Sequence, residues 1–352
     1  MKVLMVGVDS STKGGMWTVV ENYINDSQFK NETHFIYVPT SITGNAIKKI
    51  LFTLKGIIKI FGVLLTSHID IVHIHVSERG SVYRKYIVLK LAKLFKCKTI
   101  FHMHGAEFQV WYENLDKEKQ AKIRRIINQA DSILILGEYW NEFVSTIADK
   151  DKIEIVHNAV SVPDKYLYNI EANKLLFLGV VGQRKGIDDL LQAMAMTDNQ
   201  LDKDIQLFIY GPNPENDIED KILKLGLSTR VKYKGWLDNS SKKEVFKDIA
   251  LNILPSYNEG LPMTILETMA YGIPNVSTKV AAIPEAVNEE NGVLIEAGDV
   301  NALADSILTL MSNKELRKEK SMKAYNDALE EFSLENHISH ILKIYRRLEG
   351  NE

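Results

Sequence analysis

Residues 255–274 read PSYNEGLPMTILETMAYGIP, and they join a predicted strand to a predicted helix. The apolar run before them, residues 249–254, predicts a buried strand that stops at Pro255. Pro262 suits the first position of a helix, Gly272 suits the position just past its end, and Pro274 prevents continuation. The stretch therefore predicts a strand, a short polar loop and a helix in succession.

Two carboxylates lie around the start of this helix, Glu259 in the loop and Glu267 inside the helix. Helical side chains tilt toward the N-terminus, so Glu267 leans back toward the loop. A helix N-terminus attracts anions, whereas carboxylates accept hydrogen bonds from hydroxyl groups. A diphosphate flanked by hydroxyl-bearing groups, as in a sugar nucleotide, fits this arrangement. The alternative is a loop acid and a solvated helix acid with no shared role.

The surrounding motif is more specific than the two acids alone. Pro-Ser-x-x-Glu-Gly is followed by Leu-Glu-x-Met-Ala-x-Gly-x-Pro and then by IPEAV at residues 283–287. This pattern resembles the signature of retaining GT-B glycosyltransferases of family 4 (group 1), of the bacterial polysaccharide-assembly type. The resemblance implies an α/β chain with two Rossmann-like domains facing a cleft, and metal-independent transfer from a nucleotide-diphosphate sugar.

Length and composition agree with two soluble α/β domains. The chain has 352 residues, 45% apolar and 25% charged, with a net charge of −3. Its one cysteine, Cys97, excludes an internal disulfide framework. The apolar start runs directly into a polar glycine loop, so we expect no signal peptide, and no apolar run is long enough for a spanning helix. We expect a cytoplasmic protein, peripheral on the inner face of the cell membrane.

Strand and helix patterns alternate through two cycles, which predicts two parallel sheets. We expect an acceptor-binding domain at residues 1–165 and a nucleotide-sugar-binding domain at residues 166–333. Residues 157–160 resemble the family's turn at the crossing between domains. By resemblance, the C-terminal segment 334–352 packs back on the first domain, with a helix at about 337–348. Ligands are expected at the carboxyl ends of the strands.

Positive charge is concentrated between Ala46 and Lys98, a segment that contains eleven Lys and Arg residues but only two acidic residues. The pattern predicts two basic amphipathic helices, which are candidates for binding an anionic membrane. The first carries Lys48, Lys49, Lys55 and Lys59, and the second carries Arg84, Lys85, Lys90, Lys93, Lys96 and Lys98. The alternative is a pair of ordinary domain helices with lysines in water. Nucleic acid is not an expected partner, since exposed aromatics for base stacking are not evident.

The glycine-rich loop at residues 179–186 carries adjacent cations, Arg184 and Lys185, suited to neutralising a diphosphate. The family usually has an arginine where this chain has Val180, and we expect Arg184 to take its role. By resemblance, the candidate catalytic residues are His104, Glu259, Arg184 and Lys185. The candidate donor-binding residues are Gly14, Gly15, Arg184, Lys185, Tyr210, Gly211, Trp236, Leu237, Glu259, Gly260, Leu261, Pro262, Met263, Thr264 and Glu267.

A strand-end histidine, His104, resembles the family histidine that contacts the donor sugar. His102 and Glu107 are candidates for the acceptor side, although a packed histidine and an acidic loop residue are the simpler readings. The pairs His73/His75 and His102/His104 could meet on neighbouring strands, but no carboxylate or cysteine completes a metal set. Two Asp-x-Asp sequences, at residues 149–151 and 202–204, precede strands and are expected to be turns. We therefore expect neither a metal nor another cofactor.

The expected acceptor is a lipid-linked or oligosaccharide intermediate in capsule, O-antigen or exopolysaccharide synthesis. Two alternatives remain open from the sequence. One is a non-catalytic GT-B-like partner subunit that binds without transferring. The other is a sugar-nucleotide epimerase of the same architecture, which would need an acid/base pair at the sugar carbon.

Overall fold

The computed structural model describes residues 1–12 and 14–350, and its chain divides into two compact units. Unit 1 comprises Met1–Ala159 and the segment from Leu334 onward, and unit 2 comprises Val160–Ser333. The first division thus falls inside the 157–160 turn and six residues before the predicted end of the first domain. The reason is that the Val160 N–H donates to the Phe332 carbonyl at 2.9 Å, which attaches the following residues to unit 2.

Unit 1 is built on a six-stranded parallel sheet with the order β2-β1-β3-β4-β5-β6. Its strands are β1 (Lys2–Gly7), β2 (His34–Pro39), β3 (Ile71–Val76), β4 (Lys98–Met103), β5 (Ser132–Ile135) and β6 (Ile153–Ile155). Every residue of β3 is buried, as expected for a strand covered by helices on both faces.

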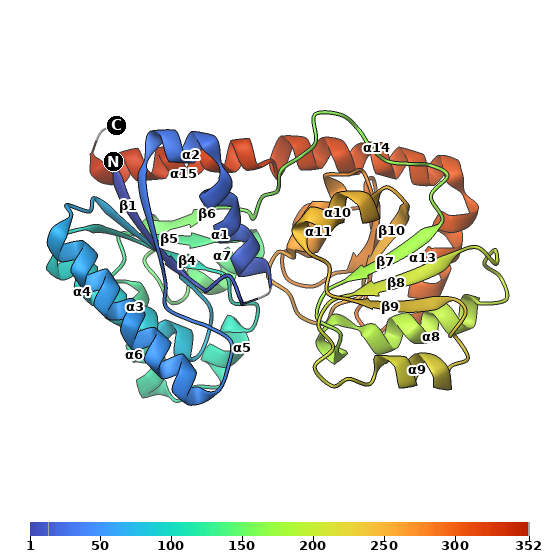
Figure 1. Ribbon diagram of the computed structural model, residues 1–352, viewed down its shortest axis with the longest axis horizontal. Helices are drawn as coiled ribbons and strands as arrows, with labels where there is room; N and C mark the ends of the chain where they lie inside the picture. Colours follow the sequence, from blue (N-terminus) through green and yellow to red (C-terminus); the bar gives the residue numbers. More distant parts are fainter. Residues whose placement is uncertain (13, 351–352) are drawn as a thin grey trace. The chain divides into compact units, whose positions relative to one another are not determined.

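Helices cover both faces of this sheet, as Figure 1 shows. One face carries α1 (Gly15–Asn25), α2 (Ser27–Glu32) and α15 (Leu334–Glu349), and the other carries α3 (Ala46–Thr66), α4 (Gly80–Leu94) and α6 (Lys117–Ile127). Two shorter helices, α5 (Phe108–Glu113) and α7 (Glu138–Val144), follow β4 and β5. The C-terminal helix α15 therefore belongs to unit 1, and it begins three residues before the predicted start.

Unit 2 has a second six-stranded parallel sheet with the order β12-β11-β10-β7-β8-β9. Its strands are β7 (Lys174–Leu178), β8 (Gln206–Tyr210), β9 (Val231–Gly235), β10 (Ile249–Leu254), β11 (Asn275–Thr278) and β12 (Gly292–Ile295). Its helices are α8 (Ile187–Thr197), α9 (Ile218–Lys224), α10 (Asn239–Phe246), α11 (Met263–Met269), α12 (Ile283–Ala286), α13 (Val300–Ser312) and α14 (Lys314–Glu331). In Figure 1, α8 and α9 lie on one face of this sheet and α10 and α11 on the other.

The strand order reverses once in each sheet. The reversal lies between β1 and β3 in unit 1 and between β7 and β10 in unit 2. Ligands of open parallel sheets bind at the carboxyl ends of the strands beside such a switch point. The two switch points therefore define where each unit should hold a ligand.

The helix that follows β10 starts one residue later than predicted. Pro262 is the N-cap, with φ −72° and ψ 123°, and helical residues begin at Met263. The proline ring fixes φ but leaves ψ free, so an extended N-cap accommodates it as well as a first helical turn. The Thr264 hydroxyl donates to the Leu178 carbonyl at 2.9 Å and thereby ties the helix to the end of β7.

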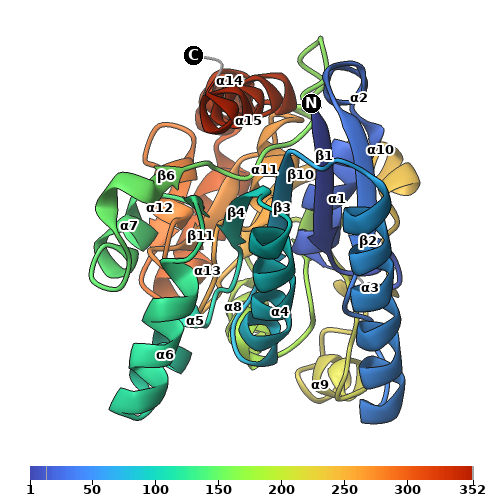
Figure 2. The same ribbon diagram turned by 90° about the vertical axis from the view of Figure 1, so that its left-hand side faces the viewer.

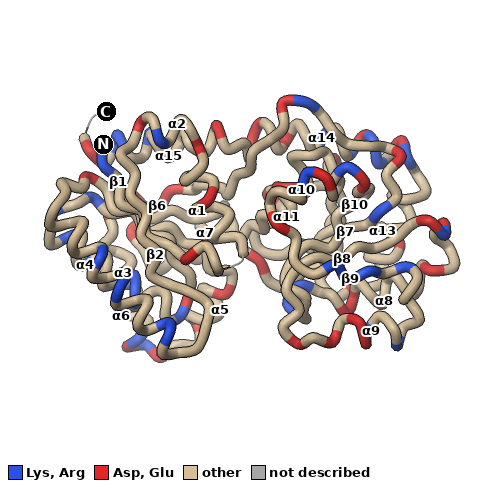
Figure 3. The backbone as a smooth tube through the Cα atoms, viewed as in Figure 1, with Lys and Arg blue, Asp and Glu red and all other residues tan. Residues whose placement is uncertain are grey.

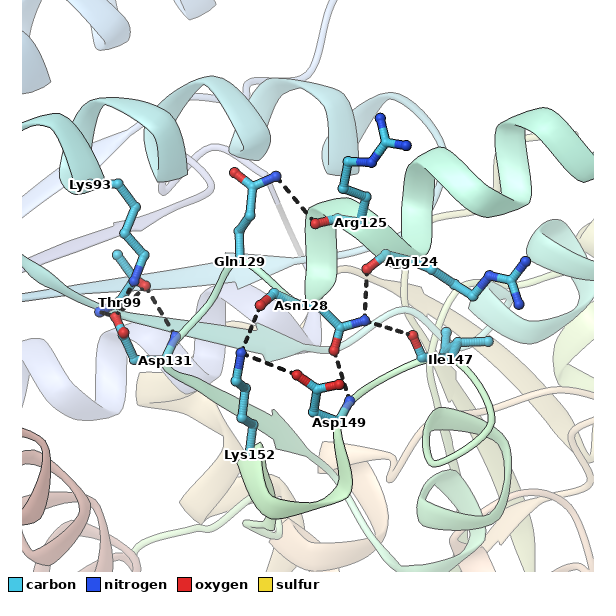
Figure 4. Close-up of polar contacts among 10 residues, drawn as sticks. All are labelled: Lys93, Thr99, Arg124, Arg125, Asn128, Gln129, Asp131, Ile147, Asp149 and Lys152. Carbon is cyan, nitrogen blue, oxygen red and sulfur yellow. Dashed lines mark hydrogen bonds and ion pairs between the residues drawn. The ribbon is translucent and has the colours of Figure 1, made fainter.

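The second basic segment is not the amphipathic surface that the sequence predicted. Lys85 is buried, Lys93 pairs with Asp131 at 2.6 Å, and Lys98 begins β4. Figure 4 shows the Lys93–Asp131 contact, in which the Asp131 carboxylate also accepts the Thr99 hydroxyl at 2.7 Å. Lys85 and Lys93 thus serve the packing of unit 1, and we keep the first segment, α3, as the candidate membrane surface. Within the part of the chain that the structure describes, none of the helices is long and apolar enough to cross a membrane.

Candidate functional site

The predicted cations and acids of unit 2 meet at its switch point. Lys185 lies in a 3-10 helix (Gln183–Lys185) after β7, and Glu259 lies in the loop after β10. The Lys185 ammonium forms an ion pair with Oε1 of Glu259, and the Ser256 hydroxyl donates to the same oxygen at 2.7 Å. Glu259 is only 4% exposed. A buried carboxylate requires such partners, so the pair fixes both side chains in place.

Arg184 approaches the same loop from the other side. Its Nη1 donates to the Asn258 carbonyl at 2.8 Å and lies 3.9 Å from Oε2 of Glu259. Its side chain remains 42% exposed, so part of the guanidinium faces solvent. Val180, at the position where the family usually has an arginine, is also partly exposed. Arg184 thus brings a guanidinium to this loop from four residues further along the chain.

A glycine, Gly186, allows the loop after β7 to lie close against the loop after β10. Gly186 adopts φ +70°, and a Cβ built on it would lie 2.0 Å from the Pro255 carbonyl oxygen. Any side chain here would push the 3-10 helix away from the end of β10. The adjoining backbone bond, from the Tyr257 N–H to the Arg184 carbonyl at 2.9 Å, depends on the same close contact. Gly186 therefore holds the cation loop against the acid loop.

The second acid has its own lysine. Glu267 on α11 pairs with Lys242 on α10 at 2.7 Å, and both side chains are largely buried. Burial raises the pKa of Glu267, and the nearby Lys242 charge offsets part of that effect. The sequence analysis missed Lys242, because its contact with Glu267 joins two helices 25 residues apart. The sequence offered one indication of its role, namely that Lys242 lies near the start of the helix that follows the Trp236-Leu237 loop.

The other predicted donor residues line the same edge of the sheet. Gly211 adopts φ +136°, and a Cβ there would lie 1.7 Å from the Gly179 carbonyl oxygen, so the loops after β7 and β8 touch through backbone. Trp236 is 45% exposed beside Leu237, which is buried. Tyr210 is half-buried against the cluster that includes Leu237. Trp236 is thus partly exposed at this edge, whereas Leu237 packs inward.

The loop between Glu259 and α11 is mostly packed. Leu261, Pro262 and Met263 are buried, and the Gly260 carbonyl accepts the Ala282 N–H at 3.2 Å. The apolar side chains of this loop therefore build the site. A ligand would meet this segment through main-chain groups.

In unit 1, His104 follows β4 and is partly exposed. Its Nε2 and the Nδ1 of His75 are 2.8 Å apart, within hydrogen-bond distance. Burial, with a smaller contribution from His337, lowers the pKa of His104 to about 3. The imidazole is therefore neutral near pH 7, and it can donate or accept a hydrogen bond but adds no positive charge.

His102 lies where an acceptor cannot reach it. It is 1% exposed, its Nδ1 lies 3.0 Å from Nε2 of His73, and its ring is 4.1 Å from that of His104. Direct contact between His102 and an acceptor was therefore the wrong expectation. The side chain points into the layer between the sheet and α15, where Tyr345 bonds His73 at 2.7 Å.

Three of these histidines are close enough to suggest a metal. The ring nitrogens of His73, His75 and His102 lie within 4.8 Å of one another. However, both nitrogens of His73 already have hydrogen-bond partners, Tyr345 and His102. Among the described residues, the unpartnered nitrogens are Nε2 of His75 and Nε2 of His102. Two nitrogens fall short of the three or four ligands of a zinc site.

The remaining candidates of unit 1 are at its surface. Glu107 forms an ion pair with Arg79 at 2.7 Å, with both side chains solvated. Gly14, with φ +146°, and Gly15 are exposed at the start of α1. Their backbone is accessible to a ligand.

Both Asp-x-Asp sequences lie in turns held by backbone and side-chain bonds. As Figure 4 shows, Asp149 pairs with Lys152 at 3.3 Å, and both residues bond Asn128. The Asp204 carboxylate accepts the Asn173 amide at 2.9 Å. Neither sequence presents a free pair of carboxylates to a metal–diphosphate complex.

Comparison with known proteins identifies unit 2. Residues 163–327 match the family described as Glycosyl transferases group 1. The chain therefore contains a group 1 glycosyltransferase domain. A relative, described as an uncharacterized 41.2 kDa protein in the cps region of Klebsiella pneumoniae, is 25% identical over 86% of this chain and 88% of its own. Other relatives of this glycosyltransferase have names from amylovoran and lipopolysaccharide core biosynthesis.

Solved structures agree with the two-unit α/β fold. Sucrose-phosphate synthase from Thermosynechococcus elongatus has a TM-score of 0.82 and 16% identity, with 100% of each chain covered. Anabaena HepE, solved with UDP-glucose, has a TM-score of 0.75 and 16% identity over 99% of this glycosyltransferase and 100% of its own chain. These likenesses establish the GT-B fold class. The family match favours transfer over the two alternatives, a non-catalytic subunit and an epimerase.

Proposed function

We propose that this glycosyltransferase moves a sugar from a nucleotide-diphosphate sugar to its acceptor, with retention and without a metal. The observation that carries the proposal is the Lys185–Glu259 pair, joined by Arg184, at the switch point of unit 2. Switch points of this kind bind nucleotides in open α/β sheets. Retention rests on the resemblance of the motif around Glu259.

The chemistry requires positive charge on the leaving diphosphate. Lys185 uses one of its three N–H donors on Glu259, so two remain for phosphate oxygens. Arg184 presents a partly exposed guanidinium beside it. Two preorganised cations can stabilise the diphosphate as the sugar–phosphate bond breaks, a role that a divalent cation has in other transferases.

The two acids would bind hydroxyl groups on either side of that diphosphate. Glu259 accepts from the transferred sugar, and Glu267 accepts from the ribose. Trp236 offers an exposed ring for the base. In unit 1, the neutral imidazole of His104 can exchange a hydrogen bond with a hydroxyl group.

A thermal-shift series with UDP-, GDP-, ADP- and TDP-sugars tests the donor proposal. A specific donor at 100 times its Kd stabilises the fold by about 2.7 kcal/mol. One nucleotide series should raise the Tm of the parent chain and of Lys247→Ala, a matched change at an exposed lysine. It should leave the Tm of Lys185→Ala unchanged. Equal shifts in Lys185→Ala, or none in the parent, would refute the site.

The reaction itself is tested with the donor so identified. Transfer should persist in excess EDTA, and the glycosidic product should keep the anomeric configuration of the donor by NMR. Loss of transfer on chelation, restored by Mg²⁺, would overturn metal independence. Inversion would overturn the mechanistic assignment drawn from the motif.

We further propose that the acceptor is lipid-linked and that α3 docks on the cytoplasmic face of an anionic membrane. A stripe of apolar side chains, each 43–70% exposed, runs along the outer face of α3 at helical spacing. The stripe consists of Ile47, Ile50, Leu51, Leu54, Ile58, Phe61 and Leu65. The opposite face is buried, with Gly56, Ile60 and Leu64 against the sheet.

Charge on α3 selects the membrane as the occupant of this stripe. Lys48, Lys55 and Lys59 flank it on one side, and α3 contains no Asp or Glu. In Figure 3, the charged positions of this helix have the colour of Lys and Arg. An apolar stripe beside lysines fits the boundary between acyl chains and anionic headgroups. Each lysine near such a surface adds about 1 kcal/mol.

Co-sedimentation with phosphatidylglycerol vesicles tests this docking. The double variant Lys55→Glu/Lys59→Glu should bind about 1,000-fold more weakly, because the net charge of α3 falls by four units and each unit is worth about 1 kcal/mol. The control is Lys203→Glu/Lys318→Glu, which makes the same change of net charge at exposed positions of unit 2. Equal binding by the two double variants would rule out α3 as the membrane surface.

A further inference from the structure

The switch point of unit 1 contains two adjacent cations that the donor site does not use. Lys85 on α4 is 1% exposed, and its ammonium donates to the Thr40 hydroxyl at 2.6 Å and to the Gly7 carbonyl at 3.1 Å. Gly7 ends β1, and Thr40 follows β2. Burial, and then the neighbouring Arg84 charge, hold the pKa of Lys85 well below its ordinary value.

Arg84 lies over the first turn of its own helix. Its Nη2 is 3.5 Å from the Ser41 hydroxyl, and a Cβ built on Gly80 would lie 3.1 Å from its Nη1. Its Nε is buried and has no hydrogen-bond partner among the described residues. Part of the side chain remains open to solvent. The guanidinium therefore has one buried N–H donor without a hydrogen-bond partner among the described residues.

Acidic side chains do not neutralise these cations. Within residues 1–12 and 14–350, neither Arg84 nor Lys85 forms an ion pair with a carboxylate. Asp9 lies on the same edge, but its carboxylate accepts the Ser11 N–H at 3.0 Å. Burying the Lys85 charge, and part of the Arg84 charge beside it, without a counter-ion costs free energy. An anion that binds between Arg84 and the start of α4 would offset that cost.

The place of Arg84 in the fold indicates which kind of anion would bind to it. Ser41 precedes the first residue of α3 by five positions, and the apolar stripe of α3 begins at Ile47. Figure 2 shows α3 and α4 running side by side on this face of unit 1. Arg84 therefore lies on the helix that packs beside the proposed membrane-binding helix. The positive end of the 15-residue helix α4 also lies near Arg84.

We propose that Arg84 and the first turn of α4 bind a phosphate or diphosphate group of the acceptor. Lys85 supports this site by holding the end of β1 together with the chain segment that follows β2. A guanidinium fork matches two phosphate oxygens, and the part of the Arg84 side chain that remains open to solvent can present this fork. Lys85 is a positioning residue, since its ammonium ties the ends of β1 and β2 together. This inference rests on the proposed function and names the chemical class of its acceptor.

The test measures anion binding without catalysis. The full chain carries Arg184→Ala and Lys185→Ala, so that the cations of unit 2 do not contribute, and inorganic pyrophosphate is titrated calorimetrically. Arg84→Ala in this background should weaken binding about tenfold or more, the scale of a lost charge-assisted hydrogen bond. Arg84→Lys should recover part of the loss. Lys90→Ala, an exposed lysine of the same helix, is the matched control and should bind as the background does.

A second arm uses vesicles that contain a polyprenyl diphosphate, against phosphatidylglycerol vesicles of equal charge. Preference for the diphosphate lipid that disappears in Arg84→Ala supports a lipid-borne acceptor. Pyrophosphate binding that depends on Arg84, with no vesicle preference, supports a water-soluble phosphorylated acceptor. Equal behaviour of Arg84→Ala and Lys90→Ala in both arms overturns the inference.

The two proposals fail separately in these experiments. A donor that shifts the Tm of the parent chain establishes the site of unit 2 whether or not Arg84 binds pyrophosphate. Conversely, the pyrophosphate titration is made in a chain whose donor cations are already removed. Melting temperatures of Arg84→Ala and Arg84→Lys within a few degrees of the background show that lost binding is not unfolding.

Discussion

Unit 1 should lose stability steeply as the pH falls below neutrality, because it buries a set of neutral imidazoles. The pKa values of His73, His75 and His102 lie well below the ordinary 6.5, chiefly through burial. Burial also lowers the pKa of His104 to about 3 and that of His337 to about 4. In the unfolded chain these groups bind protons near pH 6.5, so protons favour unfolding.

The size of the effect follows from linkage. A histidine that stays neutral when folded contributes a loss of about 1.4 kcal/mol at one pH unit below its unfolded pKa, and almost none one unit above it. Five such groups give about 7 kcal/mol between pH 7.5 and pH 5.5. The whole stability of a domain is about 5–15 kcal/mol. Unit 1 should therefore approach unfolding near pH 5.

Urea unfolding followed by tryptophan fluorescence measures this loss, because Trp17, Trp111 and Trp140 lie in unit 1 and one tryptophan lies in unit 2. His75→Asn keeps an amide near the place of Nδ1 and should reduce the acid-induced loss by about 1.4 kcal/mol. His34→Gln, at an exposed position of β2, is the control and should keep the full loss. A free energy of unfolding that is constant from pH 7.5 to 5.5 would contradict the buried-imidazole explanation.

Three further predictions concern unit 2. Gly186→Ala should cost more than 3 kcal/mol in urea unfolding and abolish the donor-induced Tm shift, whereas Gly226→Ala, with φ +72° and no atom near its Cβ, should cost only about 1 kcal/mol. Lys242→Met should destabilise unit 2 by about 3 kcal/mol, because it leaves the buried Glu267 carboxylate without its ion-pair partner. Adding Glu267→Leu should restore much of the lost stability. A double variant no more stable than Lys242→Met would contradict a coupled pair. Arg317→Met should cost about 3 kcal/mol, since its buried guanidinium bonds Tyr168 and the carbonyls of residues 170 and 310; a change below 1 kcal/mol would show that these bonds are dispensable.

Much of the fold was predictable, since parallel strands and their covering helices follow from apolar periodicity. The two-domain α/β class and the strand–loop–helix of residues 249–269 appear as local patterns, whereas the return of the C-terminal helix was expected from the family resemblance. The association of Glu259 with Lys185 followed from strand-end loops that any parallel sheet brings to one edge. These features depend on short-range sequence and on general topology.

Other features depend on contacts between distant segments, which local patterns do not encode. Lys85 has the spacing of a surface lysine, yet its ammonium lies between the ends of β1 and β2. The sequence around Lys242 did not predict its contact with Glu267 on another helix. His102 shares a strand face with His104, but α15 covers one and leaves the other partly open. In each case the partner that decides burial lies far away in the sequence.

The membership of α15 in unit 1 has a consequence for how the chain is made. Tyr345 and His337 supply the partners of His73 and Tyr23, yet they are synthesised after all of unit 2. During translation, unit 2 can complete its core while the earlier-made part of unit 1 still exposes a row of imidazoles and a phenol. We infer that unit 1 finishes folding only after residues 334–349 have been synthesised, and that a nascent chain stalled before residue 334 is a substrate for chaperones.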